Sequence, residues 1–182
     1  YVDYMNKFGN HNVSGMLLWN IDQYDNNAPG NLVASLPRRK MGFAGRLSYD
    51  YDNRYMFEVN AGYNGSENFA KGHKWGFFPS VAVGWNVSQE NFFEPLKDVI
   101  SNLKLRASYG LVGNDQLLDS SGGLIRFIYM SDITLQSENA GFTTGDKQQI
   151  TLNGPVYTRY QNNDLTWEVG EKLNVGFDMQ LF

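Results

Sequence analysis

Residues 54–65, RYMFEVNAGYNG, alternate in character at almost every step, and this alternation constrains the fold more than any other feature of the chain. Successive side chains of a β-strand point to opposite faces, so one face of this stretch is apolar and the other mostly polar. In a soluble sandwich the apolar face packs on a core, whereas in a membrane barrel it meets lipid and the polar face lines a lumen. The apolar set is Tyr55, Phe57, Val59, Ala61 and Tyr63, and the opposite set is Met56, Glu58, Asn60, Gly62 and Asn64.

Five further segments alternate with the same period of two. The first is the least regular, because Met16 and Leu18 interrupt its polar face. Many aromatic residues, 19 glycines and only 5 prolines suit strands and turns better than helices. We therefore expect an all-β fold of antiparallel strands. The predicted strands are residues 12–24, 39–51, 54–65, 75–88, 102–111 and 171–182.

Composition excludes several other classes. The net charge of −4 gives no indication of a nucleic-acid partner. Cysteine is absent, which excludes a disulfide scaffold and thiolate metal sites. No apolar run reaches the about 18 residues of a transmembrane helix, although a barrel strand needs only about 9–11 alternating residues. The chain opens with neither an initiator Met nor a signal peptide, so we expect it to be a piece of a longer polypeptide.

The predicted connections differ in length. Asp52-Asn53 is expected to form a tight turn. Residues 25–38 and 65–74 are longer and polar, and residues 112–166 are too long for an unpaired loop, so they are expected to contain at least one further hairpin. Residues 89–101 could hold one short helix. Its apolar side would comprise Phe92, Phe93, Leu96, Val99 and Ile100.

Three positions bear on the choice between membrane and water. Tyr55 and Tyr63 are roughly 26 Å apart along a strand. At a tilt near 40–45° this spacing covers roughly 19 Å of the membrane normal, close to an apolar band of about 25 Å between aromatic girdles. Pro79 removes a ladder hydrogen bond, so we expect it to begin the membrane-crossing part of its strand. Edge aromatics on a soluble sheet would look similar, and both interpretations remain open on these grounds.

Several short motifs follow one another along the chain: R-Y, Y-N-G-S, F-A, G-F-F-P, G-W, L-K-L-R-A-S-Y-G and L-T-W-E. With these motifs, residues 45–93 and 100–116 resemble the barrel of SusC/RagA-type TonB-dependent outer-membrane transporters of the Bacteroidetes. Residues 162–182 resemble a later barrel stretch of the same family. The resemblance covers most of the chain, except the first dozen residues and the variable 117–160.

The resemblance implies an outer-membrane barrel of about 22 strands with a plugged lumen. It also implies import of a glycan or peptide oligomer, energised by the TonB complex through the plug region, and a SusD-like surface lipoprotein as partner. Six strands cannot close a barrel whose smallest natural members have about eight. We therefore expect residues 1–182 to form a partial barrel domain of about 6–8 strands without a plug, embedded in outer-membrane lipid. The alternatives are a soluble β-sandwich carbohydrate-binding module and a non-transporting outer-membrane barrel.

The same resemblance assigns sides to the connections. Turns on the periplasmic side of such barrels are short and extracellular loops are long. Asp52-Asn53 and residues 89–101 would then be periplasmic, and residues 25–38, 65–74 and 112–166 extracellular.

Two groups of side chains are candidates for contacts with other molecules. The first would line the lumen, where its members could contact the plug or the cargo, or pair with one another across neighbouring strands. The second lies in the predicted outer loops, where aromatic rings could stack on sugars, pack the loops or meet the lipoprotein. The first group is Arg46, Glu58, Lys104, Arg106, Lys172 and Asp178; the second is Tyr24, Phe69, Phe142, Tyr157 and Tyr160.

Catalytic and metal chemistry have little support. No G-x-S-x-G, H-E-x-x-H, P-loop or G-x-G-x-x-G motif occurs, so we predict no enzymatic site and no cofactor. Asn114, Asp115 and Asp119 could offer oxygen ligands to calcium, but their spacing matches no calcium loop, and a solvated turn is the preferred interpretation.

Overall fold

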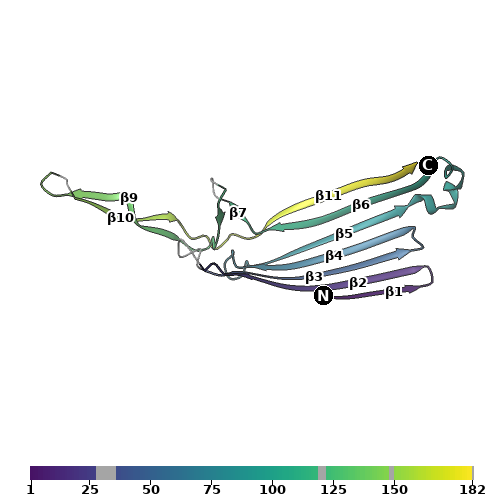
Figure 1. The fold of residues 1–182 in the computed structure, drawn as a ribbon, viewed down its shortest axis with the longest axis horizontal. Helices are drawn as coiled ribbons and strands as arrows, with labels where there is room; N and C mark the ends of the chain where they lie inside the picture. Colours follow the sequence, from purple (N-terminus) through teal and green to yellow (C-terminus); the bar gives the residue numbers. More distant parts are fainter. Residues whose placement is uncertain (28–35, 119–121, 148–149, 182) are drawn as a thin grey trace. The chain divides into compact units, whose positions relative to one another are not determined.

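The computed structural model describes residues 1–27, 36–118, 122–147 and 150–181 (Figure 1). The chain forms two compact units. Unit 1 comprises Tyr1–Ser66, Trp75–Asp115 and Trp167–Phe182, and unit 2 comprises Glu67–Lys74 and Gln116–Thr166.

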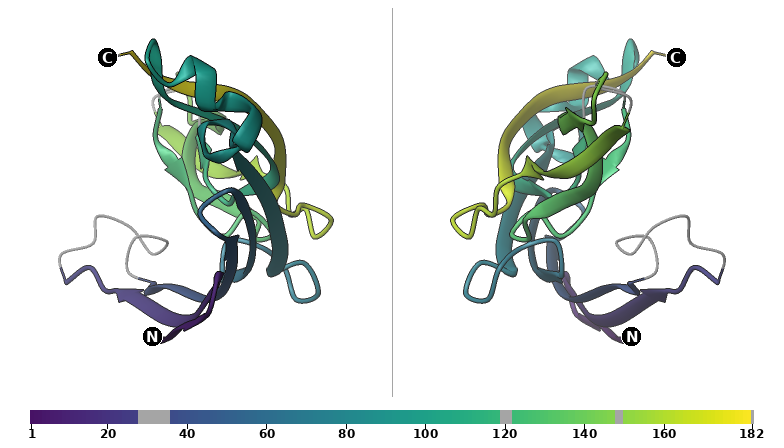
Figure 2. Two further views of the ribbon diagram at one scale, coloured as in Figure 1. Left: turned by 90° about the vertical axis from the view of Figure 1, so that its right-hand side faces the viewer. Right: turned by 90° about the vertical axis from the view of Figure 1, so that its left-hand side faces the viewer.

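Unit 1 is a seven-stranded antiparallel sheet in the order β1-β2-β3-β4-β5-β6-β11. Each strand pairs with the next along the chain, except that β6 pairs with β11, so the long connection between them adds no strand to this sheet. Figure 2, which looks along the strands, shows that the sheet arches from β1 to β11. The strands are β1 (Val2–Phe8), β2 (His11–Tyr24), β3 (Arg38–Tyr51), β4 (Tyr55–Ser66), β5 (Trp75–Asn86), β6 (Ile100–Asn114) and β11 (Glu168–Leu181).

All six predicted strands are confirmed. The sequence analysis missed β1, although its residues VDYMNKF also alternate. The tight turn is confirmed as well: Asp52 and Asn53 have φ of 54° and 55°, and Arg54 N donates to Tyr51 O at 2.9 Å. Two central residues with positive φ match the right-handed twist of a hairpin, and Asp and Asn tolerate that conformation.

The connection between β5 and β6 differs from the prediction. It contains two 3₁₀-helices, η1 (Val87–Gln89) and η2 (Asn91–Leu96), instead of one helix. Pro95 lies inside η2, and a ring without an N–H limits further helical extension. Of the five residues predicted for an apolar side, only Phe93 is buried, while Phe92, Leu96 and Val99 are exposed. No helix in the described part of the chain is long and apolar enough to cross a membrane.

Unit 2 contains the predicted hairpin. Its strands β9 (Asp132–Thr144) and β10 (Ile150–Arg159) pair antiparallel with several register shifts. A smaller ladder joins β7 (Leu117–Leu118) and β8 (Leu124–Ile125). Both chain segments of the unit contribute buried apolar side chains, namely Phe69, Ala70, Phe127 and Ile128.

Pro79 lies where the ladders of β5 become unequal. β5 pairs with β4 from Trp75 to Trp85, but with β6 only from Ser80 onward. Pro79 is therefore at a local edge toward β6, the position at which a missing N–H does least harm. Its place at a membrane boundary stays a prediction.

Phe78 lies at the point where β5 and β6 separate. Its ring meets Trp167 edge to face with centroids 5.1 Å apart. A Cβ added to Gly113 would overlap the Phe78 ring, and a Cβ on Gly76 would do the same. The two glycines thus leave room for an aromatic side chain.

We expect Gly113→Ala to lower the free energy of unfolding by about 1–3 kcal/mol, because the Phe78 ring must leave a well-packed position. Gly170→Ala on β11 is the matched control, since its Cβ would find only Val112 O at 3.8 Å. Urea unfolding of the native protein in lipid measures both. Equal effects of the two variants would contradict the packing role of Gly113.

Candidate functional site

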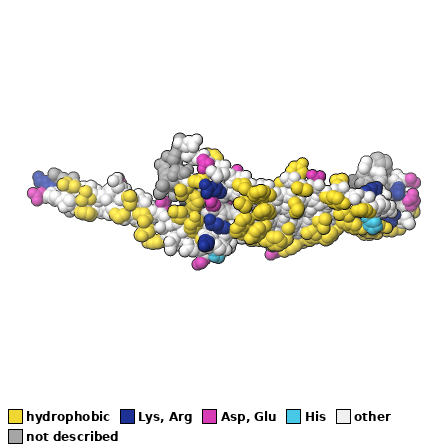
Figure 3. Space-filling model, turned by 90° about the horizontal axis from the view of Figure 1, so that it is seen from below, with side chains coloured by type: hydrophobic (Ala, Val, Ile, Leu, Met, Phe, Trp, Pro, Cys, Tyr) yellow, Lys and Arg dark blue, Asp and Glu magenta, His cyan; other side chains and the backbone are white. Residues whose placement is uncertain are grey.

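The apolar face of the unit 1 sheet is its more exposed face. In β4 and β5 the burial alternates at nearly every residue: Phe57, Val59, Tyr63 and Val83 are exposed, whereas their polar-face neighbours are partly buried. A sheet packed on a core through its apolar side shows the opposite pattern. Figure 3 shows hydrophobic side chains gathered in a band over the strands.

Aromatic side chains form a first row across the sheet near its short turns. The register places each member opposite the next, from β1 to β5. Ring centroids of His11 and Tyr51 are 5.0 Å apart, and those of Tyr51 and Tyr55 are 6.5 Å apart. The row comprises Phe8, His11, Tyr51, Tyr55 and Trp85.

A second aromatic row crosses β2 to β5 toward the long connections. It comprises Trp19, Phe43, Tyr63 and Phe77, again opposite one another in register. Trp19 and Phe43 are stacked with centroids 6.1 Å apart. Between the rows lie mostly aliphatic side chains, with Leu47, Val59 and Val81 in one register line, and Tyr49 and Phe57 lie there as well. An aliphatic band between two aromatic rows is the surface that a bilayer core and its two interfaces require.

The first row is joined to the connection after β5 through Glu90. Tyr55 Oη donates to Glu90 Oε1 at 2.6 Å, and Trp85 Nε1 donates to the same atom at 3.2 Å. Arg54 Nη1 lies 3.7 Å from Glu90 Oε2. The hydrogen bond from Tyr55, followed by that from Trp85, holds the pKa of Glu90 below its usual value. The polar ends of the aromatic rings thus meet the polar chain at the rim of the sheet, as in aromatic belts.

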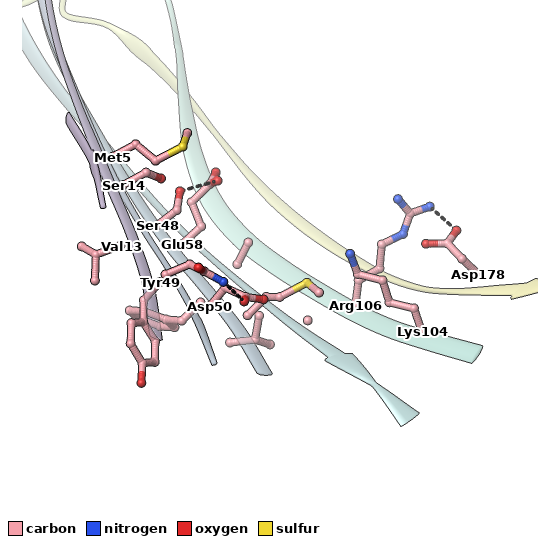
Figure 4. A pocket seen from close by; sticks show the side chains of 16 residues that line it. Met5, Val13, Ser14, Ser48, Tyr49, Asp50, Glu58, Lys104, Arg106 and Asp178 are labelled. Atoms are coloured by element: carbon pink, nitrogen blue, oxygen red, sulfur yellow. Dashed lines mark hydrogen bonds and ion pairs between the residues drawn. The ribbon is translucent and has the colours of Figure 1, made fainter. Parts of the chain in front are cut away.

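The polar face surrounds a hollow of about 460 Å³ (Figure 4). Side chains from all seven strands of the sheet reach it, among them Ser14, Ser48, Glu58, Lys104 and Asp178. Ser48 Oγ donates to Glu58 Oε2 at 3.1 Å, and Asn60 Nδ2 donates to Glu58 Oε1 at 2.8 Å. Hydrogen bonds therefore join Glu58 to its polar neighbours at the hollow.

Four of the six candidate lumen-lining residues form two ion pairs. Arg46 Nε lies 3.8 Å from Glu58 Oε1, and Arg106 Nη2 lies 3.3 Å from Asp178 Oδ1. These side chains are about half exposed, so each pair contributes little stability. Lys104 and Lys172 form no ion pair with the residues that the structure describes.

Glycines on the neighbouring strands make room for Arg106. Its register partners are Gly84 on β5 and Gly176 on β11. A Cβ on Gly176 would lie 3.3 Å from Arg106 Nε. The guanidinium group can therefore lie low over the sheet on its way to Asp178.

Asp115 is not in a solvated turn, which corrects the sequence-based interpretation. Its exposed fraction is 6%, and its carboxylate is bound by two strand-end residues. Lys40 Nζ lies 2.8 Å from Oδ1 and 2.7 Å from Oδ2, and Ser66 Oγ donates to Oδ2 at 2.7 Å. Both carboxylate oxygens already have these partners, which leaves the calcium hypothesis without support.

The other members of the proposed calcium group do not restore it. Asn114 Nδ2 donates to Glu168 Oε2 at 3.0 Å, and Asp119 lies outside the described residues. Among the described ranges, no group of three or more His, Asp or Glu side chains could hold a metal ion.

The loop aromatics are placed differently from one another. Phe69 is buried at 2% exposure, so no sugar or partner can reach its ring. Tyr24 is exposed, with the Arg38 guanidinium 5.8 Å from its ring centroid. Tyr157 and Tyr160 are exposed and stacked, with centroids 5.3 Å apart and planes at 16°. Phe142 on β9 is exposed as well.

Comparisons with known proteins agree on one family. The family model described as TonB dependent receptor-like, β-barrel, matches residues 2–182. TonB-dependent receptor P3 of Formosa agariphila is 36% identical over 138 residues, which are 76% of this chain and 12% of that protein. TonB-dependent receptor SusC of Bacteroides thetaiotaomicron is 33% identical over 76% of this chain and 13% of its own length.

Solved structures show the same fold. The structure of the RagAB peptide transporter matches with a TM-score of 0.71 at 19% identity and covers 99% of this chain and 21% of that one. The RagAB peptide importer in its closed-closed state gives a TM-score of 0.70 at 18% identity, over 99% and 21% of the two chains. The chain thus spans only 12–13% of the length of these two curated relatives.

The Asp115 cluster predicts a pH dependence. Burial raises the pKa of Asp115, but the hydrogen bonds from Lys40 and Ser66 and the charge of Lys40 outweigh burial and lower the pKa below 3.8. A lowered folded-state pKa adds stability above the unfolded value, and this contribution disappears as pH falls through the folded value. Wild type should therefore be more stable than Asp115→Asn near pH 7. In urea titrations the gap should close below about pH 4; a constant gap would contradict this origin.

Proposed function

The chain belongs to the family of TonB-dependent receptor-like β-barrels, and we propose that it forms part of the wall of an outer-membrane nutrient importer of the SusC/RagA type. The observation that carries the proposal is the exposed aliphatic band between two aromatic rows on one face of the sheet. On the other face a polar hollow with paired charges suits the water-filled side of a barrel wall.

A soluble β-sandwich fits the structure poorly. A sandwich buries the apolar sides of two sheets against each other. Here, the apolar side chains of the unit 1 strands are exposed, and the buried apolar residues of the described chain lie in connections. They are Phe69, Ala70, Val87, Phe93, Phe127 and Ile128.

We propose that the end of the sheet with the short turns faces the periplasm and that the long connections face the cell exterior. The turns after β1 and β3 are short, whereas the connections after β2, β4 and β6 are longer. The two short turns support the assignment, because barrels of this kind have short periplasmic turns and long outer loops. The connection after β5, which carries η1 and η2, is a longer one at the short-turn end. TonB would couple through a plug region in another part of the native protein.

The proposed partners follow from the relatives. One curated relative is SusC, and the structural neighbours form the RagAB peptide transporter. We propose that a SusD-like lipoprotein docks on the exterior loops and that the cargo is a glycan or peptide oligomer. Tyr157 and Tyr160 are the best-placed loop contacts, because their stacked rings are exposed next to the amide-rich stretch 161–163.

The membrane assignment is tested by an arginine on each face of β5. Val81 lies in the aliphatic line and Ala82 lines the polar hollow. Val81→Arg should cost about 2–4 kcal/mol of barrel stability in lipid, because it places a charge in hydrocarbon. Ala82→Arg is the matched control and should have a much smaller effect, since Glu58 is opposite it in register. Urea unfolding in lipid vesicles measures both.

An equal loss for the two variants would contradict the assignment of faces. If Val81→Arg lowered the stability by the same amount with lipid and without it, the membrane assignment itself would fail.

The loop contacts are tested by Tyr157→Ala combined with Tyr160→Ala. The pair should reduce cargo uptake or lipoprotein co-purification by about tenfold, because exposed aromatic anchors carry much of the binding energy at such surfaces. Thr151→Ala on β10, the strand that carries Tyr157, is the control. Unchanged uptake and unchanged co-purification would exclude these rings as contacts.

A further inference from the structure

The chain passes between the two units at four points. It leaves unit 1 after Ser66 and after Asp115, and it returns at Trp75 and Trp167. The two residues at the exits are bound to each other, because Ser66 Oγ donates to Asp115 Oδ2 at 2.7 Å. Residues 49 positions apart in the sequence thus meet at the place where both begin the path into unit 2.

Lys40 adds a third strand to this contact. It lies opposite Ser66 in the β3–β4 register, and its ammonium group lies within 2.8 Å of both Asp115 oxygens. β5 stands between β4 and β6 in the sheet, so Asp115 reaches its partners across β5. The cluster consequently joins the residue after β6 to β3 and β4, with which β6 shares no backbone ladder.

Burial makes this contact stronger than the other ion pairs of the sheet. Asp115 and Ser66 are both buried, whereas the Arg46–Glu58 and Arg106–Asp178 pairs are about half exposed. A buried carboxylate that loses its cation is left with an uncompensated charge, and this costs far more than the loss of a surface pair. The Lys40–Ser66–Asp115 cluster therefore holds these three residues together.

Unit 2 depends on both exits. Its segment Glu67–Lys74 supplies the buried Phe69 and Ala70, and its segment Gln116–Thr166 supplies the buried Phe127 and Ile128. Each segment starts directly after a residue of the cluster, Ser66 or Asp115, so fixing these two residues restricts the start of both segments at once.

We propose that the Lys40–Ser66–Asp115 cluster is the joint from which unit 2 leaves the sheet, and that breaking it loosens both segments of unit 2 together while the sheet stays folded. Phe142, Tyr157 and Tyr160 all belong to unit 2. Any effect of the joint on contacts made by these rings rests on the proposed function, and the joint itself does not.

Limited trypsin digestion of the native protein in outer membranes tests the joint. Asp115→Asn removes the charge that holds Lys40 but leaves every trypsin site intact. Cleavage should become about tenfold faster in both segments, the effect expected from losing a charge-assisted hydrogen bond. The informative sites are Lys71 and Lys74 in one segment and Arg126 and Lys147 in the other. Arg46 and Arg106 within the sheet should stay uncut.

Asp178→Asn is the matched control, because it breaks the exposed Arg106 pair and touches neither exit. It should leave all cleavage rates unchanged. Faster cleavage in only one segment, no change with Asp115→Asn, or an equal effect of Asp178→Asn would each overturn the joint.

Ser66→Ala keeps the test decisive if Asp115→Asn does not reach the membrane. It removes one hydrogen bond and no charge, so the barrel should assemble. Faster cleavage in both segments supports the joint, and unchanged cleavage overturns it. Because none of these measurements uses cargo or lipoprotein, failure of the joint is distinguishable from failure of the proposed importer function.

Discussion

Every backbone N–H and C=O that lies beside hydrocarbon needs a partner within the protein, and this constraint organises unit 1. Between β2 and β3 the ladder runs unbroken from His11↔Tyr51 to Tyr24↔Arg38, and between β6 and β11 it covers almost the full length of both strands. Because the backbone N–H and C=O groups are paired with neighbouring strands, one set of side chains can be apolar on an exposed face. The other set can be polar because it faces a hollow. The two-residue period of the sequence reflects this division between the two faces.

The polar face solves a second problem, which is to place long charged side chains beside one another without leaving them unpaired. Small residues on adjacent strands provide the room: Gly84 and Gly176 flank Arg106, which then reaches Asp178. Arg46 and Glu58 are paired at greater distance with Asn60 and Ser48 as supporting partners. The mixture of both charge signs, which looked unspecific in the sequence, becomes a set of local pairs across strands.

Local patterns could be predicted from the sequence and long-range contacts could not. Strand positions, the two faces and the Asp52-Asn53 turn follow from period and turn chemistry over a few residues. β1 carries the same signal in VDYMNKF but is short, and η2 departs from the predicted helix at Pro95. The solvated-turn interpretation of Asp115 is wrong because its partner Lys40 lies 75 residues away, and no local sequence pattern indicates that pair. The burial of Phe69 fits the predicted alternative in which loop aromatics pack the loops.

The contrast between the two kinds of ion pair in the sheet explains where rigidity is needed. Within the wall, the ladder already fixes each strand, and exposed pairs such as Arg106–Asp178 add little to it. The ladder between β5 and β6 ends at Ser80 and Gly110, before the exits to unit 2. At the exits, side-chain contacts therefore replace the backbone hydrogen bonds between these strands. A buried carboxylate with two partners from two strands fixes the geometry of this contact, because charged hydrogen bonds are directional. An apolar contact is non-directional and would not fix it. This buried polar cluster therefore lies where the regular sheet stops.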